Sequence, residues 1–486
     1  MATLTVHLSG QLKTIVFDAP QPLSRVLIES GLAHAHPCGG KGTCQKCLVT
    51  LDNTQVLACQ TVVDRNMTVV TRQKKDAQIL THGIAVSAAP DQTHRYAIAF
   101  DIGTTTVVAY LLNGLSGALL AQKSCLNPQT QYGADVISRI QYAITDKSTL
   151  QDSIRTALHD LTISVSAEAG IGSDEITAAC IVCNTAMHHL LLGIDPKPLV
   201  TPPYMPKVAA AMEICSRGLL PVNGQIRILP NIAGFVGSDT VGCMVATCFD
   251  KSKELALMID IGTNGEMVLG NSSRRIACST AAGPAFEGAK ISCGMRGAAG
   301  AVDHVWLEKD TIQYHVIGNE KALGLCGSGL LDLIAVLLEI GTIDESGSMK
   351  EASYQLADTD IILTQKDVRE VQLAKAAIRA GIELLSEKMG AAVSEIQKVY
   401  LAGAFGNYLN PASACRIGMI PPVLEKRITA IGNAAGEGAK LCVLNQAQFE
   451  YSKTLAAGTE FLELASLPQF QDSYVDALTF SEEDFQ

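Results

Sequence analysis

The chain has 486 residues, which is too long for one ordinary core and predicts two to four domains. A hydrophobic content of 48% with 17% charged residues excludes a disordered protein, and a net charge of −11 argues against a general nucleic-acid binder. No apolar run reaches the roughly 18 residues that span a bilayer, and the N-terminus lacks a signal-peptide pattern, so we expect a cytoplasmic protein with no membrane partner.

Residues 1–72 predict a small domain of strands and one helix. LTVHL and KTIVF form a predicted hairpin, and PLSRVLIESGL follows with apolar residues at helical spacing. CLVTL, QVLAC and MTVVT then predict further short strands. Hairpin, helix, loop and strands is the order of a β-grasp domain.

A cysteine-rich loop lies inside this domain, with the spacing Cys38-x5-Cys44-x2-Cys47-x11-Cys59. Plant-type ferredoxins hold a [2Fe-2S] cluster with C-x4-C-x2-C and a distant fourth cysteine, and one extra residue in the first gap is a known variant. A zinc ribbon would show two CxxC pairs. The glycines around Lys41 also resemble a phosphate loop, but Gly42 follows where GK[ST] needs Ser or Thr. The spacing therefore favours an iron–sulfur cluster over zinc or phosphate.

Residues 73–95 lose periodicity and predict a linker, in which ILTHGIAV could pack as a short strand. A flexible chain of this length would span roughly 25–30 Å root-mean-square.

An internal sequence repeat follows the linker. YAIAFDIGTTT at 96–106 returns as LALMIDIGTNG at 255–265, and each is an apolar strand that ends in Asp-Ile-Gly-Thr. The domain-sized separation predicts a duplicated α/β fold, with lobes at 96–253 and 254–486.

The two Asp-Ile-Gly-Thr loops predict a phosphate site. Glycine lets the backbone approach a ligand, and N–H groups and hydroxyls can wrap phosphate oxygens. Asp101 and Asp260 would hold Mg²⁺ through its waters or orient an attacking water. The alternative for one copy is a turn in which Asp caps its own backbone. The predicted ligand-binding residues of the two loops are Gly103, Thr104, Thr105, Thr106, Gly262, Thr263, Asn264 and Gly265.

Two later stretches fit the same scheme. In KVYLAGAFGNYLNP, a strand runs into small residues at a helix start, where a nucleotide can approach the backbone. These residues are Gly403, Ala404, Phe405, Gly406 and Asn407. LPNIAGFVGSDTVGC has the small-residue spacing of a tight helix crossing, and Asp239 within it is a candidate catalytic carboxylate.

These motifs resemble those of the superfamily that contains actin, hexokinase and the heat-shock chaperone ATPases. The resemblance implies two RNase H-like lobes with ATP and Mg²⁺ between them, and residues 403–407 near the adenosine. The whole chain is then a multidomain α+β and α/β protein: a β-grasp ferredoxin-like domain followed by a duplicated actin-like ATPase.

The fusion resembles the reductive activators of corrinoid proteins, which use ATP to return Co(II) centres to Co(I). The resemblance also covers 282–301, 323–338, 372–385 and 461–470. It implies that Cys38, Cys44, Cys47 and Cys59 bind the cluster, that a corrinoid protein is the partner, and that a low-potential donor supplies electrons. A homodimer is one option for assembly. Longer activators carry an extra small domain where this chain has only the linker.

An ATPase is useful to an electron carrier when transfer is uphill. A one-electron deficit of roughly 240 mV costs about 5.5 kcal/mol, which nucleotide-controlled binding can supply. Two other interpretations stay open: a redox-sensing small-molecule kinase with Asp239 as base, and a nucleotide-binding iron–sulfur regulator without turnover. The activators of 2-hydroxyacyl-CoA dehydratases lack a ferredoxin domain, so the cysteine spacing disfavours them.

Overall fold

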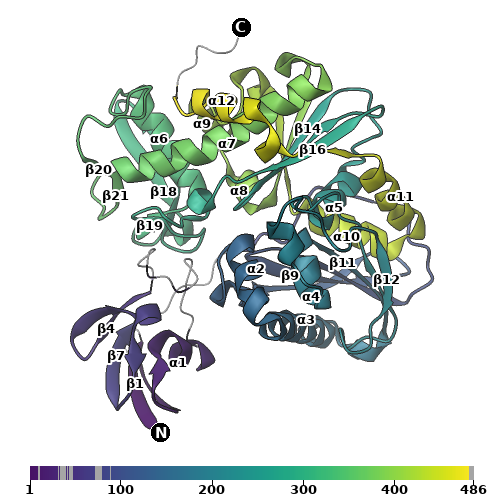
Figure 1. Ribbon diagram of the computed structural model, residues 1–486, viewed down its shortest axis with the longest axis horizontal. Helices are drawn as coiled ribbons and strands as arrows, with labels where there is room; N and C mark the ends of the chain where they lie inside the picture. The colour runs from purple at the N-terminus through teal and green to yellow at the C-terminus, as the bar shows by residue number, and fades with distance from the viewer. Residues whose placement is uncertain are drawn as a thin grey trace.

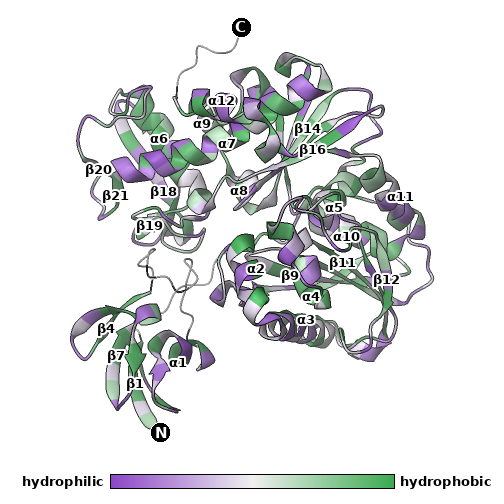
Figure 2. Cartoon of the chain, viewed as in Figure 1, coloured by the Kyte–Doolittle hydropathy of each residue, from purple (hydrophilic) through white to green (hydrophobic). Residues whose placement is uncertain are grey.

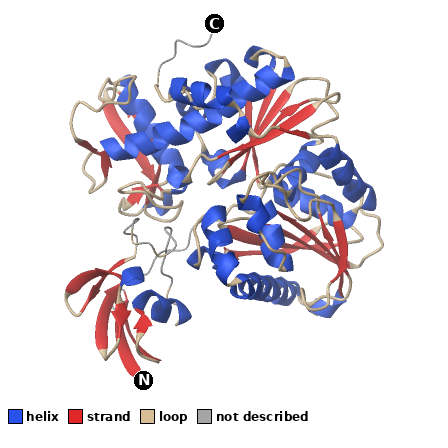
Figure 3. Cartoon of the chain, in the orientation of Figure 1, coloured by secondary structure: helices blue, strands red, loops and turns tan. Residues whose placement is uncertain are grey.

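The computed structural model describes residues 1–8, 11–30, 32, 40, 42, 47–71, 79–87 and 89–480, which form a small N-terminal domain and two larger lobes (Figure 1). Both lobes combine a central sheet with helices (Figure 3). Within the described part of the chain, no helix is long and apolar enough to cross a membrane.

The N-terminal domain is a five-stranded sheet covered by one helix. The strand order is β2-β1-β7-β4-β5, with β1 and β7 parallel and β1 and β2 antiparallel. The leucines and valines of the helix pack on the inner face of the sheet, and hydrophobic residues run along β1 and β7 (Figure 2). This arrangement confirms the predicted β-grasp domain. Its elements are β1 (Ala2–Leu8), β2 (Gln11–Phe17), β3 (Gln21–Pro22), α1 (Leu23–Glu29), β4 (Leu48–Leu51), β5 (Thr54–Leu57), β6 (Val62–Val63) and β7 (Met67–Thr71).

The first lobe is built on a six-stranded sheet in the order β10-β9-β8-β11-β13-β12. Its central strands are apolar on both faces because helices cover both, as in α/β proteins generally. The strands are β8 (Tyr96–Ile102), β9 (Thr106–Asn113), β10 (Leu119–Leu126), β11 (Ile176–Cys183), β12 (Met212–Cys215) and β13 (Gln225–Ile228). The helices are α2 (Val136–Thr145), α3 (Lys147–Ala169), α4 (Thr185–Leu192) and α5 (Ser238–Thr247).

The second lobe has the sheet order β23-β22-β14-β15-β16-β24, in which five strands repeat the first lobe and β24 pairs with β16, at the edge opposite to that of β12. Its strands are β14 (Ala256–Ile261), β15 (Gly265–Gly270), β16 (Arg275–Thr280), β22 (Lys398–Ala402), β23 (Ile428–Gly432) and β24 (Glu460–Phe461). In each lobe an antiparallel three-stranded meander is joined to parallel strands, β8 with β11 and β14 with β22. Asp101 is the penultimate residue of β8 and Asp260 that of β14. The duplication predicted from the two loops is confirmed.

A smaller subdomain and several helices complete the second lobe. The subdomain contains β17 (Ala301–Glu308), β18 (Thr311–Val316), β19 (Gly324–Leu325), β20 (Ser353–Gln355) and β21 (Ile362–Thr364). The helices are α6 (Gly327–Glu339), α7 (Gln365–Met389), α8 (Gly403–Tyr408), α9 (Pro411–Arg416), α10 (Ala434–Leu444), α11 (Gln446–Ala457) and α12 (Pro468–Asp476).

The two lobes meet where α5 crosses α10. A Cβ on Gly438 would lie 2.1 Å from the carbonyl oxygen of Gly242, so only glycine allows this approach. The predicted stretch LPNIAGFVGSDTVGC contains Gly242, whereas most of its other small residues lie just before α5. There Gly234 and Gly237 pack against the backbones of Tyr204 and Asn184, at 2.2 and 2.4 Å from an added Cβ. The tight crossing predicted for this stretch is therefore made by Gly242, against Gly438 of α10.

The linker is not a free tether along its whole length. Ile84 N donates to Ile431 O at 3.1 Å, and Asn433 N donates to His82 O at 3.0 Å. Gly83 and Gly432 form an isolated antiparallel bridge, which matches the short strand considered for ILTHGIAV. Further along, Asp91 N donates to Leu444 O at 2.9 Å. The random-coil span expected for the linker is therefore wrong for the part after residue 78.

Candidate functional site

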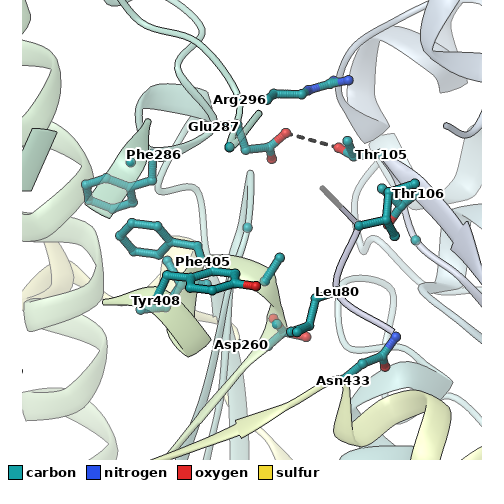
Figure 4. A pocket seen from close by; sticks show the side chains of 18 of the residues that line it. Leu80, Thr105, Thr106, Asp260, Phe286, Glu287, Arg296, Phe405, Tyr408 and Asn433 are labelled. Carbon is teal, nitrogen blue, oxygen red and sulfur yellow. Dashed lines mark hydrogen bonds between the residues drawn. The ribbon is translucent and has the colours of Figure 1, made fainter. Parts of the chain in front are cut away.

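Both Asp-Ile-Gly-Thr loops open into one cavity of about 560 Å³ between the lobes. The cavity brings together residues from β8, α5, β14 and α8. Figure 4 shows Thr105 of the first loop, Asp260 of β14 and Phe405 of α8 around it. Of the predicted site residues, those that line it are Asp101, Gly103, Thr104, Thr105, Thr106, Asp239, Asp260, Gly262, Thr263, Asn264, Gly403, Ala404 and Phe405. The lining does not include Gly265, which begins β15, or Gly406 and Asn407, which lie in α8.

The first loop is held in place from behind by three side chains. Asn127 Nδ2 donates to Gly103 O at 2.8 Å, and Asn184 Nδ2 donates to Thr104 Oγ1 at 2.9 Å. The guanidinium of Arg139 donates to Thr104 O and, through Nε, to Gly133 O at 2.8 Å. Arg139 is completely buried, and this burial lowers its pKa to about 9. These contacts hold the loop against the cavity in a fixed conformation.

Four carboxyl groups surround the inner end of the cavity. Burial raises the pKa of Asp101 to about 7, although the Nδ2 of Asn433 donates to its Oδ2 at 2.8 Å and favours the charged form. Burial and the neighbouring carboxylates raise the pKa of Asp260 to about 7, and burial raises that of Asp239 to about 6. Burial also raises the pKa of Glu266 well above its usual range. These groups would gain most from a cation placed among them.

Glu266, Glu287 and Asn433 line the cavity but were not predicted from the sequence. Glu287 spans the two loops: its carboxylate accepts hydrogen bonds from Thr105 Oγ1 at 3.0 Å and from Thr263 Oγ1 at 2.5 Å. Sequence signals existed for two of them. Glu266 follows the second loop directly, and Glu287 lies in a stretch quoted for the family resemblance.

Gly403 closes the cavity against the second loop. It has φ +80°, and an added Cβ would lie 2.5 Å from Oδ1 of Asp260. Two residues later, the ring of Phe405 stacks on that of Phe286, with centroids 4.8 Å apart and planes inclined by 4°. The loop 403–407 thus combines a backbone cradle beside a carboxylate with a flat apolar surface, which suits a nucleotide.

The iron–sulfur loop is described only in part, because Cys38 and Cys44 lie outside the described residues. Cys47 is buried and Cys59 half-buried, at the base of the loop. Gly40 and Gly42 have φ of +80° and +77°, and Gln60 Nε2 donates to Gly40 O. Among the described residues, no three histidine, cysteine or carboxylate side chains converge enough to hold a metal directly.

Comparisons with known proteins cover the whole of this architecture. The chain is 39% identical over 415 residues to a corrinoid activation enzyme, RamQ, of Eubacterium limosum, which covers 78% of this chain and 69% of that protein. This chain belongs to the family of reductive activators of corrinoid proteins. Residues 254–486 match the C-terminal ASKHA domain of the reductive activator RACo, 96–252 match its middle region, and 6–68 match a 2Fe-2S cluster binding domain.

Two further relatives of this family agree. A [Co(II) methylated amine-specific corrinoid protein] reductase of Methanosarcina barkeri is 30% identical over 300 residues, which are 56% of this chain and 55% of that protein. The solved structure of a reductive activator for a corrinoid, iron–sulfur protein superimposes with a TM-score of 0.71 at 27% identity and covers 98% of both chains. As a member of the family, the chain carries an iron–sulfur domain and a nucleotide-binding ASKHA domain.

Proposed function

We propose that the protein uses ATP to pass an electron from its own cluster to the Co(II) corrinoid of a partner protein, which gives Co(I). The observation that carries the proposal is the joining of an iron–sulfur domain to a cavity in which two phosphate-type loops face each other. The names of the relatives, which act on corrinoid proteins, support it.

On this proposal, Cys38, Cys44, Cys47 and Cys59 hold a [2Fe-2S] cluster, which supplies one electron when bound. Four thiolates at ferredoxin-like spacing are the donor set that such a cluster takes. The positive φ of Gly40 and of Gly42 fits a tightly turned loop, a conformation that glycine adopts readily.

The cavity would hold ATP with Mg²⁺, which neutralises phosphate charge. Asp101 and Asp260 fit a cation held through its waters, since both are buried and gain by becoming charged next to it. Asp239, in the first turn of α5, would orient the attacking water. Thr105 and Thr263 line the same cavity, and their hydroxyls would bind phosphate oxygens. The segment 403–407 would lie near the adenosine.

The proposal divides the chain into a ferredoxin-like domain at 1–72, a linker at 73–95 and ATPase lobes at 96–253 and 254–486. An upstream low-potential donor in the cytoplasm would supply the electron. The energetic reason is the uphill transfer: a site that binds ATP and ADP differently can shift a population by the about 5.5 kcal/mol that a roughly 240 mV deficit requires.

The decisive experiment mixes the reduced protein with a cognate Co(II) corrinoid protein, with and without Mg-ATP, and follows the Co(I) absorbance. We expect a signal that requires ATP. Cys47→Ser should abolish it while ATP binding persists, and Asp260→Ala should abolish ATP dependence while the visible spectrum of the cluster persists. The exposed Cys215→Ser is the matched control and should leave both unchanged.

Absence of an ATP-dependent Co(I) signal with every cognate partner would contradict the proposal. Phosphate transfer from ATP to an added metabolite, independent of corrinoid, would instead identify a small-molecule kinase with Asp239 as its base. Nucleotide binding without any turnover would identify a regulator.

A further inference from the structure

The cavity is rich in carboxylates and contains a single arginine. Arg296 is the one arginine among the described lining residues, which include no lysine. Asp101, Asp239, Asp260 and Glu266 are acidic. A triphosphate that enters brings further negative charge, and phosphate sites are generally completed by cationic side chains as well as metal. The position of this arginine is therefore informative.

Arg296 is free to meet a ligand. Within the described part of the chain, its guanidinium has no hydrogen bond or ion pair, although the side chain is half-buried. Its backbone is fixed: Met295 N donates to Leu325 O at 2.8 Å, and an added Cβ on Gly288 would lie 2.5 Å from Met295 N. A half-buried arginine on a rigid loop, without a partner, is placed to bind an anion.

Arg296 also lies on the phosphate side of the cavity. Figure 4 shows its side chain above that of Glu287, whose carboxylate accepts from the threonines of both loops. The aromatic pair of Phe286 and Phe405 is drawn apart from it. We propose that Arg296 is the cationic group that binds the terminal phosphate of ATP, an assignment that rests on the proposed ATP binding.

The test compares Mg-ATP and Mg-ADP affinities of the full-length holoprotein by calorimetry. Arg296→Gln should weaken ATP binding about 10- to 100-fold and ADP binding less than about 3-fold, because one charged hydrogen bond to phosphate is lost. Lys290→Gln is the matched control, since Lys290 lies on the same loop but is exposed and pairs with Glu370 at 3.5 Å. It should leave both affinities unchanged.

Equal losses for ATP and ADP, or no loss for either, would overturn the assignment. Arg296→Lys keeps the charge without the guanidinium, so it should recover part of the ATP preference and guards against a folding defect in the first variant. If the unaltered protein binds neither ATP nor ADP, the proposed function is wrong, and the assignment of Arg296 is wrong with it.

A different observation concerns residues 79–84, which we call the strap. Ile79 and Leu80 line the nucleotide cavity, and Figure 4 shows Leu80 beside Asp260 and Asn433. The rest of the strap is bound to the start of α10: the N-cap Asn433 donates from its backbone N to His82 O, and Gly83 N donates to Glu437 Oε1, in the first turn, at 3.2 Å. The chain that leads to the iron–sulfur domain thus begins inside the nucleotide site.

The strap shortens the tether of the N-terminal domain. Between Thr71 at the end of β7 and Ile79, an extended chain spans at most about 29 Å. If the strap left its place, the tether would run to Val86, which packs against the buried core, and could span about 54 Å. The strap therefore sets how far the cluster can travel.

A contact between Leu80 and a hydrated, charged ligand is unfavourable. An apolar side chain next to Asp260 offers no hydrogen bond to phosphate or to the waters of a cation, and it would desolvate them. We propose that Mg-nucleotide in the cavity displaces Leu80, releases the strap and lengthens the tether. This deepens the proposed function by linking nucleotide binding to the reach of the cluster domain.

Hydrogen exchange on the full-length holoprotein tests the strap. Mg-ATP should speed exchange of the Gly83 and Ile84 amides at least about 10-fold, since both are bonded only while the strap is in place. The Asp91 amide, bonded to Leu444 O in the same linker, is the internal control and should not change. Unchanged or slower exchange at 83 and 84 with bound nucleotide would overturn the proposal.

A mutation gives an independent measure. Leu80→Ala should raise Mg-ATP affinity about 3- to 10-fold, because less apolar surface must leave the site. Val86→Ala, which removes a similar side chain from the linker outside the cavity, should not. A Leu80→Ala variant with equal or weaker affinity would refute displacement, whether or not the protein reduces a corrinoid.

Discussion

Replacing Gly403 by alanine tests the construction of the site most directly. The residue has φ +80°, where an L-residue costs about 1–2 kcal/mol. The new Cβ would also lie 2.5 Å from Asp260 Oδ1, nearly 1 Å inside a normal contact, which adds about 1–3 kcal/mol of overpacking. We expect a loss of about 2–5 kcal/mol in the free energy of unfolding of the second lobe, with the carboxylate of Asp260 displaced.

The control for Gly403→Ala is Gly390→Ala. Gly390 ends α7 with φ +72°, but nothing lies within 4 Å of its Cβ, so only the about 1–2 kcal/mol backbone cost applies. Thermal unfolding and calorimetric titration with Mg-ATP should show that Gly403→Ala is the less stable variant and binds about 10- to 100-fold more weakly. Equal destabilisation, with unchanged affinity in both, would refute the steric account.

Three further outcomes follow from the same contacts. Burial raises the pKa of Asp101 to about 7, so its contribution to stability is present below pH 4 and is lost as the pH rises to about 7. Asp101→Asn should therefore reduce the change in the urea unfolding midpoint between pH 5 and 8. Asn433→Ala should weaken Mg-ATP binding about 10-fold by calorimetry, whereas Asn445→Ala, which also removes an N-cap, should cost stability only. Gly438→Ala should lower the free energy of unfolding by about 3–5 kcal/mol in urea titrations, against about 1–2 for Gly170→Ala, where nothing surrounds the Cβ.

The parts of the site that local patterns encode were predictable. An apolar strand that ends in Asp-Ile-Gly-Thr fixes its own turn, so Asp101 and Asp260 could be placed at equivalent strand ends before any contact was known. Thr105 and Thr263 follow from the same turns. Their convergence on one cavity followed from the duplication.

Residues that reach the site from far along the chain were not predictable. Asn433 bonds Asp101 across 332 residues, and Glu287 bonds Thr105 across 182. Nothing local distinguishes an asparagine that caps a helix from one that also donates to a carboxylate in the cavity. The strap shows the same limit: the sequence allowed a short strand in ILTHGIAV, but its partner, Gly432 at the end of β23, lies about 350 residues away and could not be predicted locally.

These long-range contacts bear on how ATP could drive an electron uphill. The carboxyl groups of Asp101 and Asp260 are buried with raised pKa values, so on the proposed function a cation that enters with the nucleotide favours their charged forms. The strap begins in the lining of the same cavity. Asn433 binds His82 of the strap through its backbone N and Asp101 through its side chain. Binding of Mg-ATP and release of the cluster domain would then be one event, because a ligand shifts an equilibrium only through its different affinity for the two states. The about 5.5 kcal/mol needed would come from the difference in affinity for ATP and ADP between the two positions of the strap, and not from the redox properties of the cluster.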